Sequence, residues 1–232
     1  MNILSILMVV FLAGSASGIA YGILNLILVK PYIDMAIELE AEREGVAVNL
    51  AYRSWQLQGG MIAAVIAGIT YSLLYTIVYI VTNSMSKGIK RSILLALVIW
   101  SVIYLIPVLK YPANPPAVGD PETIYFRQIA FITYILISGV SASSLYILGI
   151  RVGKSSRLRS TMISVSSYAV VMMLAYILMP SNMDSIEVSE DILLGFRYTS
   201  AITSLALWVM LGVTTSLLWK KSGLVKSSMS MD

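Results

Sequence analysis

The chain has 232 residues, of which 58% are apolar and only 12% are charged, and its formal net charge is +4. Because a soluble domain carries about 25% charged residues, this composition indicates a membrane protein. The sequence contains neither cysteine nor histidine, which excludes disulfides, thiolate or imidazole metal sites and histidine-based catalysis.

Six segments without a charged residue are each 18 residues or longer, and they are the predicted membrane spans. They cover residues 3–29, 60–81, 92–109, 129–150, 161–179 and 201–219. About 20 apolar residues cross the hydrocarbon core, where only helices or closed barrels satisfy the backbone. The runs lack the alternation of barrel strands. The sequence therefore predicts an all-α, polytopic protein whose 232 residues form a single transmembrane domain.

The charges outside the spans predict the topology. If the amino terminus is cytoplasmic, the segments 83–91, 151–160 and 220–232 lie inside and hold ten Lys or Arg and one acidic residue. The other loops hold six Lys or Arg and eleven Asp or Glu. Since basic residues collect on the cytoplasmic side, we expect both termini inside and three hairpins that turn outward, in a multi-pass protein of the plasma membrane. The acidic outer face either attracts cations or simply reflects the exclusion of bases.

Glycines recur at every fourth position of the first span, at Gly14, Gly18 and Gly22. This spacing removes side chains from one helix face, so we expect a seam where another helix packs closely.

The segment after the first span reads as a short helix, 31–44, that begins at a proline. Asp34, Glu38 and Glu42 share one side of this helix at intervals of four residues. An amphipathic helix on the outer interface explains the pattern without further function. A cation or a partner protein that screens the carboxylates is the alternative.

The six spans contain no Asp, Glu, Lys or Arg, which argues against a proton relay or an intramembrane protease. Their polar atoms come from Ser, Thr, Tyr and Asn25, which either pass a cation or hydrogen-bond between helices. The segment Gly149-Ile-Arg-Val-Gly-Lys-Ser155 imitates a phosphate-binding loop, but its glycine spacing is wrong and it follows a membrane span. We therefore expect no enzymatic activity, no cofactor, and no nucleotide or nucleic-acid partner.

A proline-rich loop, residues 110–127, separates the third and fourth spans. Its four prolines fix φ and remove backbone donors, which predicts neither a helix nor an inner strand. The loop presents Asn114, Asp120 and Glu122, and Arg127 is the expected structural partner of one of these carboxylates. The loop is either an ion-collecting site or a charge-paired cap that fixes two helices.

The sequence Lys110-Tyr-Pro-Ala-Asn-Pro-Pro-Ala-Val-Gly-Asp-Pro-Glu-Thr123 resembles the signature of the CbtA family, proposed cobalt transporter subunits. Pro31-Tyr-Ile-Asp-Met-Ala-Ile-Glu-Leu-Glu40 and Asp191-Ile-Leu-Leu-Gly-Phe-Arg197 resemble its opening and its final span. The resemblance covers most of the chain. It implies a cobalt uptake component that works with a small membrane subunit, CbtB, which carries histidines.

One departure from the family concerns the metal. Many members carry histidines in the first outer loop, where this sequence has Glu40-Ala-Glu-Arg-Glu-Gly-Val-Ala-Val-Asn49. The chain itself therefore lacks the nitrogen ligands that Co²⁺ prefers. Either a partner supplies them, or oxygen atoms hold the ion loosely, or the substrate is different.

Together these features predict a membrane subunit of a cobalt, or divalent-cation, uptake transporter with Co²⁺ as its substrate. The candidate ion-binding residues are Asp34, Glu38, Asn114, Asp120 and Glu122 at an acidic outer mouth. The rival is a non-transporting scaffold or accessory subunit of a larger membrane complex. Both hypotheses place the chain in lipid beside other membrane subunits.

Overall fold

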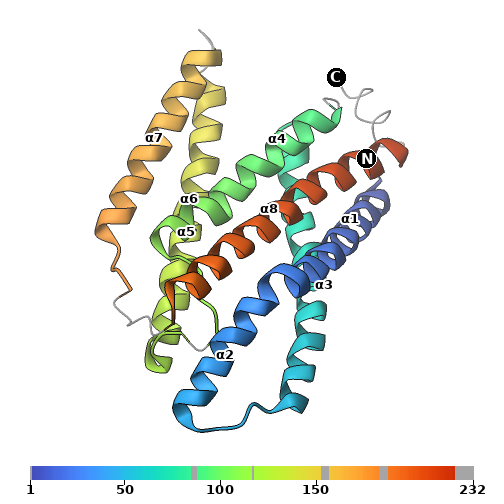
Figure 1. The fold of residues 1–232 in the computed structure, drawn as a ribbon. Coiled ribbons are helices and arrows are strands. Elements are labelled where there is room, and N and C mark those ends of the chain that lie inside the picture. Colours follow the sequence, from blue (N-terminus) through green and yellow to red (C-terminus); the bar gives the residue numbers. More distant parts are fainter. Residues whose placement is uncertain (1, 85–87, 117, 153–156, 183–187, 223–232) are drawn as a thin grey trace. The chain divides into compact units, whose positions relative to one another are not determined.

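The computed structural model describes residues 2–84, 88–116, 118–152, 157–182 and 188–222, which are all helical or loop (Figure 1). Residues 85–87, 153–156 and 223–232, in the predicted cytoplasmic loops and tail, lie outside the described residues, as do residues 1, 117 and 183–187. The elements in chain order are α1 (Ile3–Leu24), the π-helix η1 (Asn25–Val29), α2 (Lys30–Glu44), α3 (Leu50–Val81), α4 (Gly88–Trp100), the π-helix η2 (Ser101–Leu105), α5 (Ile106–Lys110), the 3-10 helix η3 (Pro121–Thr123), α6 (Ile124–Val152), α7 (Arg157–Leu178) and α8 (Glu190–Lys221).

Among the described residues, six helical stretches are long and apolar enough to cross a membrane, which confirms the predicted all-α, polytopic fold class. They are Ile3–Glu44, Leu50–Val81, Gly88–Lys110, Pro121–Ile150, Leu158–Leu178 and Glu190–Lys221. Each predicted span falls in one of these stretches, except that Met179 lies just beyond the fifth.

The helices divide between two compact units. The first unit consists of Met1–Trp100, Asn114–Ala117 and Val188–Asp232, and the second of Ser101–Ala113 and Val118–Glu187. The first unit therefore contains α1 to α4 and α8, and the second contains η2, α5, η3, α6 and α7.

Glycines of α1 lie directly against α3 in the first unit. A Cβ atom added at Gly14 would lie 2.5 Å from the Ile69 Cα, and one at Gly18 would lie 2.7 Å from the Ala64 carbonyl oxygen. Gly22, one turn further, lies beside the Met61 side chain. The residue numbers of these partners on α3 fall as the residue numbers of the glycines on α1 rise, so the two helices are antiparallel. Their backbones touch at Gly14 and Gly18.

The helix α8 runs antiparallel to α1 and parallel to α3. Ser17 of α1 shares a 3.4 Å hydrogen bond with Thr214, whereas Asn25 at the other end of α1 accepts one from Thr203 at 3.4 Å. The apolar core of this unit includes Leu207 and Leu211 of α8, which are almost completely buried. Helices α1, α3 and α8 thus pack together in the first unit.

Both π-helical segments end two residues before a proline. η1 ends at Val29 and is followed by Pro31, and η2 ends at Leu105 and is followed by Pro107. A proline inside a helix lacks its N–H and its ring displaces the carbonyl four residues earlier, so the helix widens locally. The helix consequently continues through Pro31 instead of ending there.

Aromatic residues build the core of the second unit. The Tyr134 hydroxyl donates to the Met172 carbonyl at 3.1 Å, which joins α6 to α7. The Tyr111 ring meets the Tyr134 ring edge-on at 5.8 Å, and its hydroxyl donates to the Pro180 carbonyl at 2.6 Å. These contacts anchor the start of the proline-rich loop to the end of α7.

The helix expected at 31–44 is present as α2, which ends at Gly45 with a left-handed φ of 67°. It continues the helix of the first span without a break, so the prediction of a separate helix that begins at the proline is wrong. The prediction that all of 110–127 is irregular is wrong at both ends, because Lys110 ends α5 and residues 121–127 are helical. Asp120 caps this helical start, and Pro121 occupies the first turn, where its missing N–H costs nothing.

Candidate functional site

Asp34 lies on α2, five residues beyond the uncharged run, and two cationic side chains hold its carboxylate. Lys30 Nζ and Arg53 Nη2 both donate to it, and Arg53 Nη1 also donates to Gln56 Oε1 at 2.6 Å. Burial alone would raise the pKa of Asp34, but the hydrogen bonds and charges of Lys30 and Arg53 outweigh it and lower the pKa below its usual value. An arriving cation therefore competes with two resident positive charges at this carboxylate.

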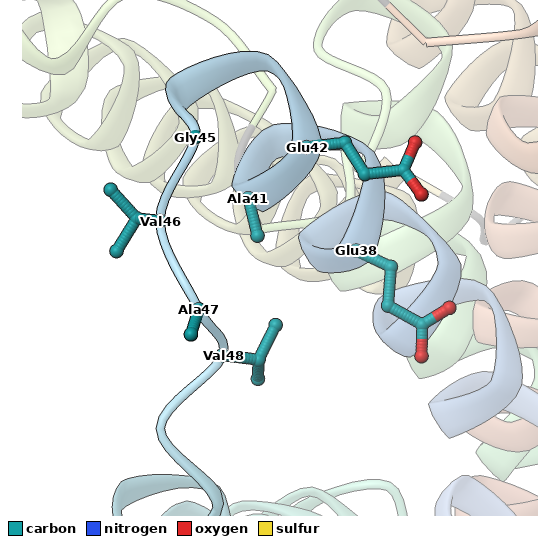
Figure 2. Close-up of a pocket in the computed structure, with 7 residues that line it drawn as sticks. All are labelled: Glu38, Ala41, Glu42, Gly45, Val46, Ala47 and Val48. Atoms are coloured by element: carbon teal, nitrogen blue, oxygen red, sulfur yellow. The ribbon is translucent and has the colours of Figure 1, made fainter.

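Glu38, one turn further along α2, is exposed beside a shallow hollow of about 520 Å³ that opens to solvent. Figure 2 shows Glu38 and Glu42 on the same side of the helix, whereas Val46 of the following segment points away from them. The hollow is lined by Glu38, Ala41, Glu42, Gly45, Val46, Ala47 and Val48. Its openness suits brief contact with a hydrated ion more than the enclosure of a dehydrated one.

Asn114 is positioned by an arginine of α8 within the same unit. Arg197 Nη2 donates to the Asn114 side-chain oxygen at 2.8 Å. Burial lowers the pKa of the Arg197 guanidinium, which nevertheless stays charged at neutral pH. The hydrogen bond fixes this part of the proline-rich loop to the start of α8.

Asp120, Glu122 and Arg127 belong to the second unit. The Asp120 carboxylate accepts from the Glu122 backbone N–H at 2.8 Å and so caps η3, while the Glu122 side chain is exposed. Arg127 Nη1 donates to the Val118 carbonyl and Nη2 to the Asp120 carbonyl, both at 3.1 Å. Arg127 thus braces the loop through two backbone carbonyls.

Within the described ranges, no three acidic side chains gather closely enough to hold a metal ion. Asp34, Glu38 and Asn114 belong to the first unit, and Asp120 and Glu122 to the second. In each unit these oxygen atoms suit electrostatic attraction of a hydrated cation rather than chelation of a bare one.

Sequence reasoning missed two of the arginines that position these residues. Arg53 and Arg197 each precede an uncharged span, where the simplest explanation is a side chain that reaches the interface. In the structure Arg53 donates to Asp34 and Arg197 donates to Asn114. The signal was the recurrence of an arginine before the second, fourth and sixth spans, which the linear sequence could not connect to a partner.

Comparison with known proteins identifies the family. The model of the family described as probable cobalt transporter subunit (CbtA) matches residues 3–220. No curated protein and no solved structure matches the chain. Because the family match extends over nearly the whole length, including α2, the proline-rich loop and α8, the chain belongs to the CbtA family.

Proposed function

We propose that this chain is the membrane subunit of a cobalt uptake transporter and that its outer loops collect hydrated Co²⁺. The observation that carries this proposal is the match to the cobalt transporter subunit family over residues 3–220. Six membrane-length helices and the concentration of acidic residues in three of the loops support it. A rim of one charge sign raises the local concentration of the oppositely charged ion and its rate of arrival.

The exposed carboxylates are the first contacts in this scheme. Glu38 on α2 and Glu122 at the start of η3 both face solvent. Asp120 adds a second negative charge beside Glu122. Asp34 likewise adds a negative charge beside Glu38. Lys30 and Arg53 partly neutralise the charge of Asp34. Asn114 contributes an amide oxygen with no charge.

The ion that reaches these oxygens keeps most of its water, because carboxylate and amide oxygens are weaker ligands for Co²⁺ than imidazole. This chain has no histidine with which to replace that water. A second membrane subunit that carries histidines, like CbtB, supplies the nitrogen ligands in our scheme. Selectivity for cobalt then arises in the assembled transporter, and this chain provides attraction and the membrane scaffold.

The alternative function is a scaffold or accessory subunit that carries no ion. It is favoured by the tight glycine packing of α1 on α3 and by the lack of an acidic triplet in the described ranges. Purification in mild detergent separates the two: a stable stoichiometric complex with enzyme subunits supports the scaffold, and a complex with a small histidine-bearing subunit supports the transporter.

The experiment for the proposed role is uptake of radiolabelled Co²⁺ by cells that express the Asp120→Asn/Glu122→Gln double variant. Asparagine still caps a helix start, so this variant removes two charges while it keeps the loop. We expect uptake to fall several-fold at submicromolar Co²⁺ with unchanged abundance in the membrane.

The comparison variant is Glu190→Gln/Asp191→Asn, which removes two charges from the exposed start of α8 in another predicted outer loop. We expect it to lose less uptake than the proline-rich-loop variant. Normal uptake by the double variant would remove the proline-rich loop from the ion path.

A further inference from the structure

One membrane-length helix is shared between the two compact units. The stretch Gly88–Lys110 is a continuous helix that consists of α4, η2 and α5. Its first part, up to Trp100, belongs to the first unit, and its second part, from Ser101, belongs to the second unit. The junction coincides with the start of the π-helix η2, where the helix departs from α-helical geometry. The two parts of this helix therefore have separate packing partners.

Buried hydrogen bonds fix α4 to the first unit. The Ser92 hydroxyl donates to the Gly212 carbonyl of α8 at 2.7 Å, and the Ser92 carbonyl accepts from the Tyr75 hydroxyl of α3 at 2.8 Å. Gly212 has no side chain to separate the helices, and a Cβ there would lie 3.1 Å from that of Ala96. Because a broken buried hydrogen bond leaves a costly unpaired group, α4 stays with α3 and α8.

Other helices hold the second part of the shared helix. Ser138 of α6 is 0% exposed, and its hydroxyl donates to the Val102 carbonyl of η2 at 2.5 Å. The same hydroxyl shares a 2.7 Å hydrogen bond with Tyr168 of α7. A polar chain thus runs from η2 through α6 to α7. The edge-on contact of Tyr111 with Tyr134, just beyond α5, adds to this attachment.

The proline in α5 explains why the Val102 carbonyl is open to Ser138. An N–H group at position 107 would bond to the Ile103 carbonyl in an α-helix and to the Val102 carbonyl in a π-helix, but Pro107 has no N–H. Within a membrane, a carbonyl freed in this way needs another donor, and a serine of a neighbouring helix can supply it. Ser138 does so, which ties η2 to the second unit.

The other π-helix also precedes a proline, but a single unit holds both of its sides. η1 ends at Val29, two residues before Pro31. Gly18 of α1 lies against α3 on one side, and on the other the Tyr32 ring of α2 occupies the space of a Cβ at Gly195 of α8. These helices all belong to the first unit, so a bend at η1 would break contacts within one body.

We infer that η2 is a hinge about which the two units move as separate bodies. Prolines and π-helical turns are where helices bend sharply. A bend between Trp100 and Ser101 preserves the hydrogen bonds that Ser92 makes on one side and Ser138 on the other. A few residues at the end of an element suffice for such a hinge.

The role of the hinge rests on the proposed function, because transport needs a motion that exposes a site to each side of the membrane in turn. In transporters this motion is largely the movement of one bundle of helices against another. The movement of the two units does not itself depend on cobalt. It is measured as a distance and not as uptake.

The test is double electron–electron resonance on the spin-labelled full chain in lipid nanodiscs. The sequence has no cysteine, so two introduced cysteines carry the only labels. Val81→Cys with Leu158→Cys, on exposed positions of α3 and α7, measures the distance between the units. Val81→Cys with Tyr198→Cys and Ile129→Cys with Leu158→Cys measure distances within the first and the second unit. We expect the between-unit distribution to be at least twice as broad as either within-unit distribution.

Three variants locate the movement at η2. Pro107→Ala restores the missing N–H, so we expect the between-unit distribution to narrow to the width of the within-unit distributions. Pro31→Ala is the matched control in the other π-helix and should leave the between-unit distribution unchanged. Ser138→Ala removes the donor to the Val102 carbonyl and should broaden the distribution further.

The hinge is disproved if the wild-type between-unit distribution is as narrow as the within-unit ones, or if Pro107→Ala leaves it as broad as before. Should Pro107→Ala fail to fold, an unchanged width in Ser138→Ala disproves the hinge instead. A narrow between-unit distribution in a chain that takes up Co²⁺ with its small subunit refutes the hinge alone. A broad distribution that Pro107→Ala narrows, in a chain that takes up no Co²⁺, refutes the proposed function and supports the hinge.

Discussion

Arg197 and Asn114 join the start of α8 to the proline-rich loop, although 83 residues separate them in sequence. Nη2 of Arg197 donates to the Asn114 side-chain oxygen at 2.8 Å, and both side chains are half-buried. The loop is therefore held by a long-range contact as well as by the stiffness of its prolines. Any ion attracted to this part of the chain meets a fixed arrangement of polar atoms.

This contact predicts a difference between two substitutions of Asn114. Asn114→Ala removes the acceptor, and we expect it to lower the free energy of unfolding by about 1.5 kcal/mol, as for other hydrogen bonds to a charged group. Asn114→Asp keeps an acceptor for Arg197, so we expect it to lower the free energy of unfolding much less. Thermal unfolding of the two variants in the same detergent measures the difference; equal losses would show that the Arg197 contact contributes nothing.

The packing of α1 on α3 predicts opposite effects at two glycines. At Gly18 a Cβ would lie 2.7 Å from the Ala64 carbonyl oxygen and 2.8 Å from the Val65 Cα, so Gly18→Val must push the helices apart. We expect a loss of several kcal/mol or failure to fold. Gly60→Ala, where nothing lies within 4 Å, should stabilise α3 by about 0.5–1 kcal/mol.

Size-exclusion profiles and Tm values of both glycine variants provide the measurement. A Gly18→Val protein that folds normally would contradict the close approach of the two backbones.

The ion pairs of Asp34 predict a pH dependence. Because the folded-state pKa of Asp34 is lowered, its contribution to stability is present at neutral pH and is lost as the pH falls below about 4 and through that pKa. Since the pairs are partly solvated, the contribution is at most about 1 kcal/mol. The Tm difference between wild type and Asp34→Asn should be largest near pH 7 and should decrease as the pH is lowered.

Glu38→Gln, on the same helix and exposed, serves as the control for the pH series and should track wild type throughout. A Tm difference for Asp34→Asn that stays constant from neutral to acidic pH would show that the charge of Asp34 has no part in stability.

The second unit offers a matched pair of tyrosines. The Tyr111 hydroxyl donates to the Pro180 carbonyl at 2.6 Å and the residue is 8% exposed, so Tyr111→Phe should destabilise the protein by about 1 kcal/mol. Tyr125 is 78% exposed, and Tyr125→Phe should change stability very little. Chemical denaturation of both variants checks this expectation, and a neutral Tyr111→Phe would mean that the bond does not anchor the loop.

The uncharged runs predicted the six spans because charged side chains are costly in hydrocarbon, but they underestimated the length of the helices that contain the spans. α3 begins at Leu50 and α8 at Glu190, about ten residues before each run. Asn49 and Ser189 cap these starts by accepting from the Tyr52 and Ile192 N–H groups. A search for uncharged segments omits such polar first turns, although their capping residues are visible in the sequence.

The polar partners were harder to predict than the helices. The ion pair of Asp34 with Lys30 can be predicted from their spacing of four residues on a helix. The ion pair of Asp34 with Arg53 depends on how the segment between α2 and α3 folds back. The unpartnered hydroxyl of Thr76 has no sequence signature either, since Thr70 and Thr82 on the same helix bond to their own backbone. Whether a hydroxyl is locally satisfied depends on its rotamer, which packing between helices decides.

In the proposed function, cobalt crosses the membrane through a complex of this chain with a small histidine-bearing subunit. Accumulation of radiolabelled Co²⁺ in sealed vesicles that contain the purified chain, with and without that subunit, tests this function. We predict Co²⁺ accumulation above that of protein-free vesicles when both subunits are present. Accumulation no greater than in protein-free vesicles, with both subunits folded and inserted, would contradict the account and favour the scaffold.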